Sequence, residues 1–241
     1  MFNEDNVSVG YRDPVETASL ARTFMARVFS WMFLALTITA ITSFIWAASP
    51  SLMRLLIKPE GGMSIFGWVV MLAPLGFVLL MSFGFQKLSA PLMTLLFIVY
   101  AVLMGMSFSF IFFVYSVGTI GITFGITAGM FGVMALAGYF TKTDLTKFGS
   151  ILMMGVVGLI VAMLVNFFLK SNMMGYIISI IGVLIFTGLT AYDVQKLKRI
   201  GTGMGSDQVV ARKMSIMGAL TLYLDFINLF LFLLRLMGGR K

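Results

Sequence analysis

The sequence contains no cysteine and no histidine. Without cysteine there can be no disulfide, no thiolate nucleophile and no Cys-ligated metal. Without histidine there is no imidazole proton relay and no His-ligated metal. Carboxylates, tyrosines and lysines are the titrating side chains that remain with an obvious catalytic or gating use, so any functional site must be built mainly from oxygen groups.

Charge is also scarce, because only 11% of the residues are charged while 60% are hydrophobic, and the mean hydropathy is +1.03. These values lie outside the range of soluble domains. A membrane core of about 30 Å takes about 20 helical residues to cross. Apolar runs of this length occupy residues 24–47, 64–85, 91–114, 118–140, 149–169, 173–193 and 214–236. They are too continuous for barrel strands, so we predict an all-α membrane protein with a seven-transmembrane helix bundle.

Little chain remains outside these runs. We expect residues 1–22 to form a polar cytoplasmic N-terminal tail, residues 23–238 the transmembrane domain and residues 239–241 a short basic tail. The first apolar run is long enough to span, so we interpret it as an uncleaved first helix rather than a signal peptide. No segment is left for a separate catalytic domain, and we expect the protein not to be an enzyme.

The net charge of +8 does not indicate a nucleic-acid partner here, because the basic residues cluster in the loops, where they act as topology signals. The N-terminal tail and even-numbered loops carry Arg12, Arg22, Arg27, Lys87, Lys142, Lys147, Lys196, Lys198, Arg199, Arg212 and Lys213. The odd-numbered loops carry only Arg54, Lys58 and Lys170. This bias predicts a cytoplasmic N-terminus. A fully crossing seventh segment would place the basic C-terminal tail outside, and a re-entrant one would keep it inside; we favour seven crossings.

Glycines recur every four residues in the fourth apolar run, at Gly121, Gly125 and Gly129. Small residues at this spacing allow another helix to approach closely. We therefore predict that these three glycines form a helix-packing face, static or gating.

Two of the nine acidic residues lie within otherwise apolar, membrane-length segments: Asp193 in GLTAYDVQKLK and Asp225 in ALTLYLDFINLF. A carboxylate in hydrocarbon is costly, so it usually faces the protein interior and marks an ion or proton pathway. Thr190 shares a helix face with Asp193, and Thr221 and Asn228 share one with Asp225. Each segment thus offers an oxygen-lined stripe to a partner.

If these stripes face each other, Asp193 and Asp225 could share a proton, because two like charges in a low dielectric disfavour each other. When ionised, the pair would offer hard oxygen ligands for Ca²⁺. Two carboxylates are too few for a tight calcium site of 6–8 ligands, so this metal site would suit transient passage. The structural alternative is that Asp193 caps the membrane end beside Lys196, and that Asp225 and Asn228 only tie helices together.

The stretches AGMFGVMALAGYFTKTDLTKFG (128–149), GLTAYDVQKLK (188–198) and GALTLYLDFINLFLFLLRLMG (218–238) resemble the bacterial branch of the Bax inhibitor-1 family, from about residue 20 onward. The resemblance implies a central C-terminal helix surrounded by six others. It also implies a pH-sensitive calcium leak in the bacterial inner membrane, with Asp193 and Asp225 as the proton-sensing dyad, Ca²⁺ as the transported ion and no cofactor. Some members latch the closed state with an arginine after the second helix; this chain has Lys87 there, which puts such a latch in doubt.

Two other functions remain open. The protein could regulate a membrane quality-control protease or another membrane assembly, with residues 2–20 as the docking tail. Its two membrane aspartates could also serve an intramembrane aspartyl protease. Those enzymes carry a Gly-x-Gly-Asp and a later Pro-Ala-Leu element, whereas LYL precedes Asp225 and no proline follows Pro91. The sequence therefore disfavours proteolysis.

Overall fold

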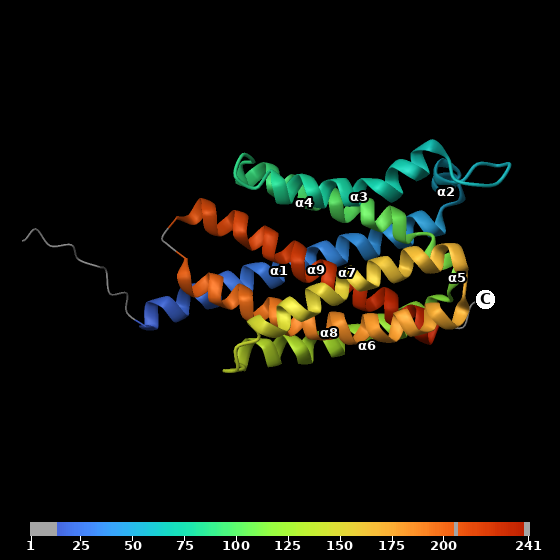
Figure 1. The fold of residues 1–241 in the computed structure, drawn as a ribbon. Coiled ribbons are helices and arrows are strands. Elements are labelled where there is room, and N and C mark those ends of the chain that lie inside the picture. The colour runs from blue at the N-terminus through green and yellow to red at the C-terminus, as the bar shows by residue number, and fades with distance from the viewer. Residues whose placement is uncertain (1–13, 205–206, 239–241) are drawn as a thin grey trace, which may run out of the picture.

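The computed structural model describes residues 14–204 and 207–238, which form a bundle of nine helices (Figure 1). Residues 1–13 and 239–241 lie outside the described part, and with them most of the predicted N-terminal tail and docking segment and the whole basic C-terminal tail. The helices are α1 (Pro14–Ala48), α2 (Pro50–Leu56), α3 (Ile65–Phe83), α4 (Ala90–Phe108), α5 (Ile111–Val114), α6 (Val117–Phe140), α7 (Thr146–Leu169), α8 (Asn172–Gly203) and α9 (Gln208–Met237).

Within residues 14–204 and 207–238, seven stretches are long and apolar enough to cross a membrane, which confirms the predicted seven-span bundle. They cover Ala18–Ala48, Ile65–Phe83, Ala90–Val114, Val117–Phe140, Thr146–Leu169, Asn172–Gly203 and Gln208–Met237. The ends of the last two differ from the expectation, because α8 continues past residue 193 and α9 begins before residue 214. Val194 and Leu197 are buried, so this basic stretch forms an amphipathic helical extension rather than a loop.

Serine side chains define where four of the helices begin. In each case the hydroxyl accepts a hydrogen bond from the backbone N–H three residues further on, which satisfies one of the unpaired donors of the first turn. The four serines are Ser64 before α3, Ser89 before α4, Ser116 before α6 and Ser171 before α8. These caps stabilise the first turn of each helix.

Helix α9 is the centre of the bundle. In its most apolar 18-residue window 72% of the residues are buried, against 6% for α7. It packs against α1, α4, α6 and α8, while α3 and α7 pack mainly on α4 and α8. The predicted central C-terminal helix is thus confirmed, although two of its six neighbours lie in an outer layer. With 30 residues, α9 is about 45 Å long, enough for a complete crossing.

A buried hydrogen-bond network joins α9 to two of its neighbours. The Thr39 hydroxyl on α1 donates to the backbone carbonyl of Ala101 on α4 at 2.9 Å, and it lies 2.8 Å from the hydroxyl of Tyr223 on α9. Because the Thr39 proton is used toward Ala101, the Tyr223 hydroxyl donates to Thr39. This network fixes α9 two residues before Asp225.

We expect Thr39→Val to destabilise the protein more than Tyr223→Phe. The valine would leave the fully buried Tyr223 hydroxyl without an acceptor, which costs about 1–3 kcal/mol, whereas the phenylalanine removes only the donor at a net cost of about 1 kcal/mol. Thermal unfolding of the two purified variants in the same detergent measures the difference. A larger loss for Tyr223→Phe would contradict this account of the network.

Candidate functional site

The structure brings the two membrane aspartates together. Asp193 on α8 and Asp225 on α9 are only 8% and 5% exposed, and their carboxyl groups are close enough to form a hydrogen bond with each other. Such a bond requires that one of the two groups holds a proton. Apart from the Asp193 carboxyl group, no described residue offers a hydrogen bond to the buried Oδ2 of Asp225.

The predicted polar lining lies on the same two helices but makes only local hydrogen bonds. The Thr190 hydroxyl is buried and donates to the Phe186 carbonyl at 2.8 Å. Thr221 and Asn228 are half-buried, and each donates to the carbonyl four residues earlier on α9. Their oxygen lone pairs therefore stay available as acceptors. The described residues show no hydrogen bond from Asn228 to another helix, so the interpretation of Asn228 as a tie between helices finds no support.

Two further buried oxygens have no hydrogen-bond partner among the described residues: the hydroxyls of Thr123 on α6 and Thr187 on α8. Helices α6, α8 and α9 all pack against one another. A buried polar atom without a partner costs about 1–3 kcal/mol, and a bound water or ion is a common explanation for one. Thr123 is not among the site residues predicted from the sequence, although its spacing from the buried Thr127 marks the inward face of α6.

The predicted glycine packing face is wrong. An added Cβ at Gly121, Gly125 or Gly129 would meet no atom within 4 Å, because these residues lie on the exposed side of α6. In a membrane both sides of a helix can be apolar. The glycine spacing therefore identifies one face of the helix but does not show whether that face lies toward lipid or toward the protein interior. The inward side of α6 instead carries Thr123 and Thr127.

The close approach between α6 and another helix occurs near the C-terminal end of α6, at Gly138. A Cβ there would overlap the backbone of Ala191 on α8, at 2.8 Å from both its Cα and its carbonyl carbon. Ala191 is two residues before Asp193. Gly138 therefore sets how near α6 lies to the part of α8 that carries the site.

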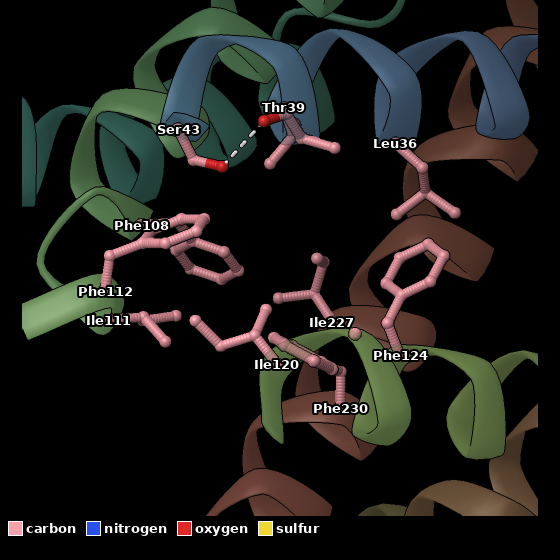
Figure 2. Close-up of a pocket in the computed structure, with 12 residues that line it drawn as sticks. Leu36, Thr39, Ser43, Phe108, Ile111, Phe112, Ile120, Phe124, Ile227 and Phe230 are labelled. Atoms are coloured by element: carbon pink, nitrogen blue, oxygen red, sulfur yellow. Dashed lines mark hydrogen bonds between the residues drawn. The ribbon is translucent and has the colours of Figure 1, made fainter. Parts of the chain in front are cut away.

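A cavity of about 210 Å³ lies between α1, α5, α6 and α9 (Figure 2). Ile227 and Phe230 of α9 line it, starting two residues after Asp225. The lining is mostly apolar, and Thr39 and Ser43 of α1 supply its hydroxyls (Figure 2). The cavity thus places empty space along α9 between the aspartates and the end of the bundle where α9 terminates.

At the other end, the turn between α6 and α7 is held on α8 by Gln195. Its Nε2 donates to the Thr143 carbonyl at 2.7 Å, and its Oε1 accepts from the Leu145 N–H at 2.9 Å. Gln195 is buried and lies two residues after Asp193. Arg199, one turn further along α8, pairs with Asp144 of the same turn at 2.5 Å. We call these contacts the loop clamp; their partners are about 50 residues apart, so the sequence offered no local signal for them.

Asp144 does not contribute a pH response near neutrality. Hydrogen bonds from the Thr146 side chain and backbone, followed by the Arg199 guanidinium, hold the pKa of Asp144 well below its usual range. A group whose pKa is lower in the folded state stabilises the fold above its unfolded pKa and loses that effect as the pH falls through the lowered value. Asp144 therefore stays ionised between about pH 5 and 8.

We predict that Gln195 matters more to the loop clamp than the visible ion pair does. Gln195→Met would leave the Thr143 carbonyl and the Leu145 N–H unpaired and cost about 1–3 kcal/mol of stability. Asp144→Asn removes an exposed ion pair of a kind that contributes little. Thermal unfolding at low and high salt separates the two variants, and an Asp144→Asn loss equal to that of Gln195→Met would refute the ranking.

The described residues contain no group of three or more acidic side chains that could hold a metal. A cation at Asp193 and Asp225 would therefore meet two carboxylates, with hydroxyl, amide or water oxygens as its other ligands. That set fits a hard cation such as Ca²⁺ in a weak, passing contact.

Comparisons with known proteins agree on the family. The model of the family described as "Inhibitor of apoptosis-promoting Bax1" matches residues 21–241. The chain is 47% identical to the Escherichia coli K12 protein named "Inner membrane protein YbhL", over 91% of this chain and 93% of that protein. It is 42% identical to a Rickettsia prowazekii protein, over 91% of each chain, and 33% identical to a Streptococcus pyogenes membrane protein, over 89% and 92%. The chain is thus an integral membrane protein that belongs to the Bax inhibitor-1 family.

Proposed function

We propose that this protein is a pH-sensitive calcium leak channel gated by Asp193 and Asp225. The observation that carries the proposal is that these two carboxyl groups face each other in the interior of the bundle, on two helices that pack along one another. Charged groups are rarely kept in such a place without a role in moving ions or protons. No enzymatic reaction and no resident cofactor are part of the proposal.

Protonation would set the position of α8 relative to α9. While one proton is held between the carboxyl groups, their hydrogen bond joins the two helices and leaves a single negative charge. Loss of that proton leaves two like charges in a low dielectric, which repel each other. The helices then separate at this point, and the ionised oxygens become ligands for Ca²⁺.

The polar atoms nearby suit such a path. Thr190 on α8, and Thr221 and Asn228 on α9, keep free oxygen lone pairs beside the dyad, and Thr123 and Thr187 have buried oxygens without described partners. The cavity of Figure 2 lies on another face of α9, where Ile227 and Phe230 line it.

We place the N-terminus in the cytoplasm and the protein in a bacterial inner membrane. The first argument is the excess of Lys and Arg in the loops at the end of the bundle where α1 begins. The second is the printed name of the E. coli relative. With this orientation, the loop clamp faces the cytoplasm and α9 ends on the opposite side.

Calcium uptake into liposomes that contain the purified protein tests whether it conducts at all. We expect uptake above that of empty liposomes at about pH 8, and a strong reduction in Asp225→Asn. Glu60→Gln is the matched control, because Glu60 is an exposed acid in the turn before α3. Uptake equal to that of empty liposomes would overturn the channel function and shift weight to a role as a regulator of a partner protein.

A further inference from the structure

A second polar site lies at the turn between α7 and α8, at the end of the bundle opposite the start of α1 (Figure 1). A cavity of about 450 Å³ opens there, and its polar lining consists of Asn166, Lys170, Ser171, Asn172 and Arg235. Two of these five side chains are cations and none is a carboxylate. The cavity is separate from the aspartate pair, from the cavity of Figure 2 and from the loop clamp.

Hydrogen-bond donors converge in this cavity without an acceptor. Asn166 is only 9% exposed, and the direction of its amide is fixed because Oδ1 accepts from the Ser171 N–H at 3.1 Å. Its Nδ2 and the Arg235 guanidinium both lie over Gly175 of α8, where an added Cβ would be 3.3 Å from Nδ2 and 2.9 Å from the guanidinium carbon. Within residues 14–204 and 207–238, neither donor group has a hydrogen-bond acceptor or an acidic partner.

Two features of the backbone add to the positive field. The first turn of α8 points its N–H groups toward this end, and a helix N-terminus attracts anions. Lys170, the capping residue that follows the last residue of α7, has φ 52°, in the left-handed region where glycine is the usual residue. Its side chain also lines the cavity and has no ion pair among the described residues. Lys170 thus occupies a position where the backbone conformation favours glycine.

We propose that this cavity binds the phosphate group of an anionic membrane phospholipid. The amide of the buried Asn166 and two cations, the exposed Arg235 and Lys170, have no acceptor or acidic partner among the described residues, and together with a helix N-terminus they form a phosphate site. The surroundings indicate a lipid, because Phe167 and Phe168 in the last turn of α7, at the membrane end of a spanning helix, are 72% and 75% exposed and would contact lipid rather than water. Met163 and Phe167 also form an apolar wall of the cavity, along which an acyl chain would lie.

Native mass spectrometry of the full chain in detergent, titrated with phosphatidylglycerol or phosphatidylcholine, tests this site. We expect the anionic phosphatidylglycerol to bind more tightly, and Arg235→Gln or Lys170→Gln to weaken that binding about tenfold each. Lys58→Gln is the matched control: it removes the same charge at the same end of the bundle, beside a cavity whose lining contains no buried amide. Its affinity should be unchanged.

Gly175→Ala tests the geometry with all charges kept. The new methyl group occupies the space of the Arg235 guanidinium, which must move away from Asn166. We expect weaker phosphatidylglycerol binding together with unchanged or higher thermal stability, since alanine favours a helix. Arg235→Lys should keep more binding than Arg235→Gln, which separates a charge effect from misfolding.

Competition with inorganic phosphate distinguishes the source of the phosphate group. If millimolar phosphate leaves phosphatidylglycerol bound, the site is a lipid site as proposed. If phosphate displaces the lipid, and Arg235→Gln and Lys170→Gln lose phosphate binding, the cavity recognises a phosphate group as proposed. The ligand is then a soluble anion rather than a lipid. Equal binding of the two lipids with no binding of phosphate, or an equal loss in Lys58→Gln, would overturn the proposal.

Discussion

Gly138→Ala should destabilise the protein by about 1–3 kcal/mol, the usual cost of forcing an extra carbon into a packed core. The new Cβ would overlap the backbone of Ala191. A flexible side chain could rotate away from such a contact, but a helix backbone cannot, so α6 and α8 would have to move apart. The shift would fall within two residues of Asp193 and should therefore also alter calcium flux.

Gly125→Ala is the matched control for this prediction. It is the same substitution on the same helix, at a position where the added carbon meets nothing within 4 Å. Alanine is the better helix former by about 1 kcal/mol, so this variant should be as stable as the wild type or more stable. Thermal unfolding of both variants in one detergent gives the comparison. If Gly138→Ala is no less stable than Gly125→Ala, the contact between α6 and α8 is not as close as described.

Asp193→Asn and Asp225→Asn should each hold calcium flux at its low-pH level, about tenfold below the wild type at high pH. Asparagine cannot ionise, so neither variant can form the pair of like charges that separates α8 from α9. If the two carboxyls titrate as one unit, the double variant should lose no more than either single variant.

Flux measured at two pH values for the two single variants and the double variant checks this prediction. Independent roles for the two residues would appear as a loss in the double variant equal to the product of the single losses. That result would mean that Asp193 and Asp225 do not act as one unit. Thermal unfolding of the same samples excludes a trivial loss of fold.

The seven spans and the two membrane aspartates could be predicted because both depend on local properties of the sequence, whereas only the family resemblance implied that the aspartates meet. Hydropathy marks a span residue by residue, and a carboxylate within an apolar run stands out by its cost. The end of α8 was harder to predict, since Lys196, Lys198 and Arg199 look like loop residues until Val194 and Leu197 are seen to be buried.

Helix orientation could not be read from the sequence for a different reason. Lipid and protein interior are both apolar, so the exposed Gly125 and the buried Gly138 look alike in the sequence, and only the packing tells them apart. The loop clamp of Gln195 and the convergence of Asn166 with Arg235 also join residues far apart in the chain. Such contacts depend on the fold as a whole.

The pH profile of calcium flux through the wild-type protein in liposomes tests the central claim most directly. If a proton shared between Asp193 and Asp225 closes the path, calcium flux through the wild type should rise with pH between about pH 5 and 8. The flux through Asp225→Asn should stay low and should not change with pH. Asp144 remains ionised over this range and contributes no slope. Flux that is independent of pH in the wild type, or a slope that persists in Asp225→Asn, would contradict gating by this pair.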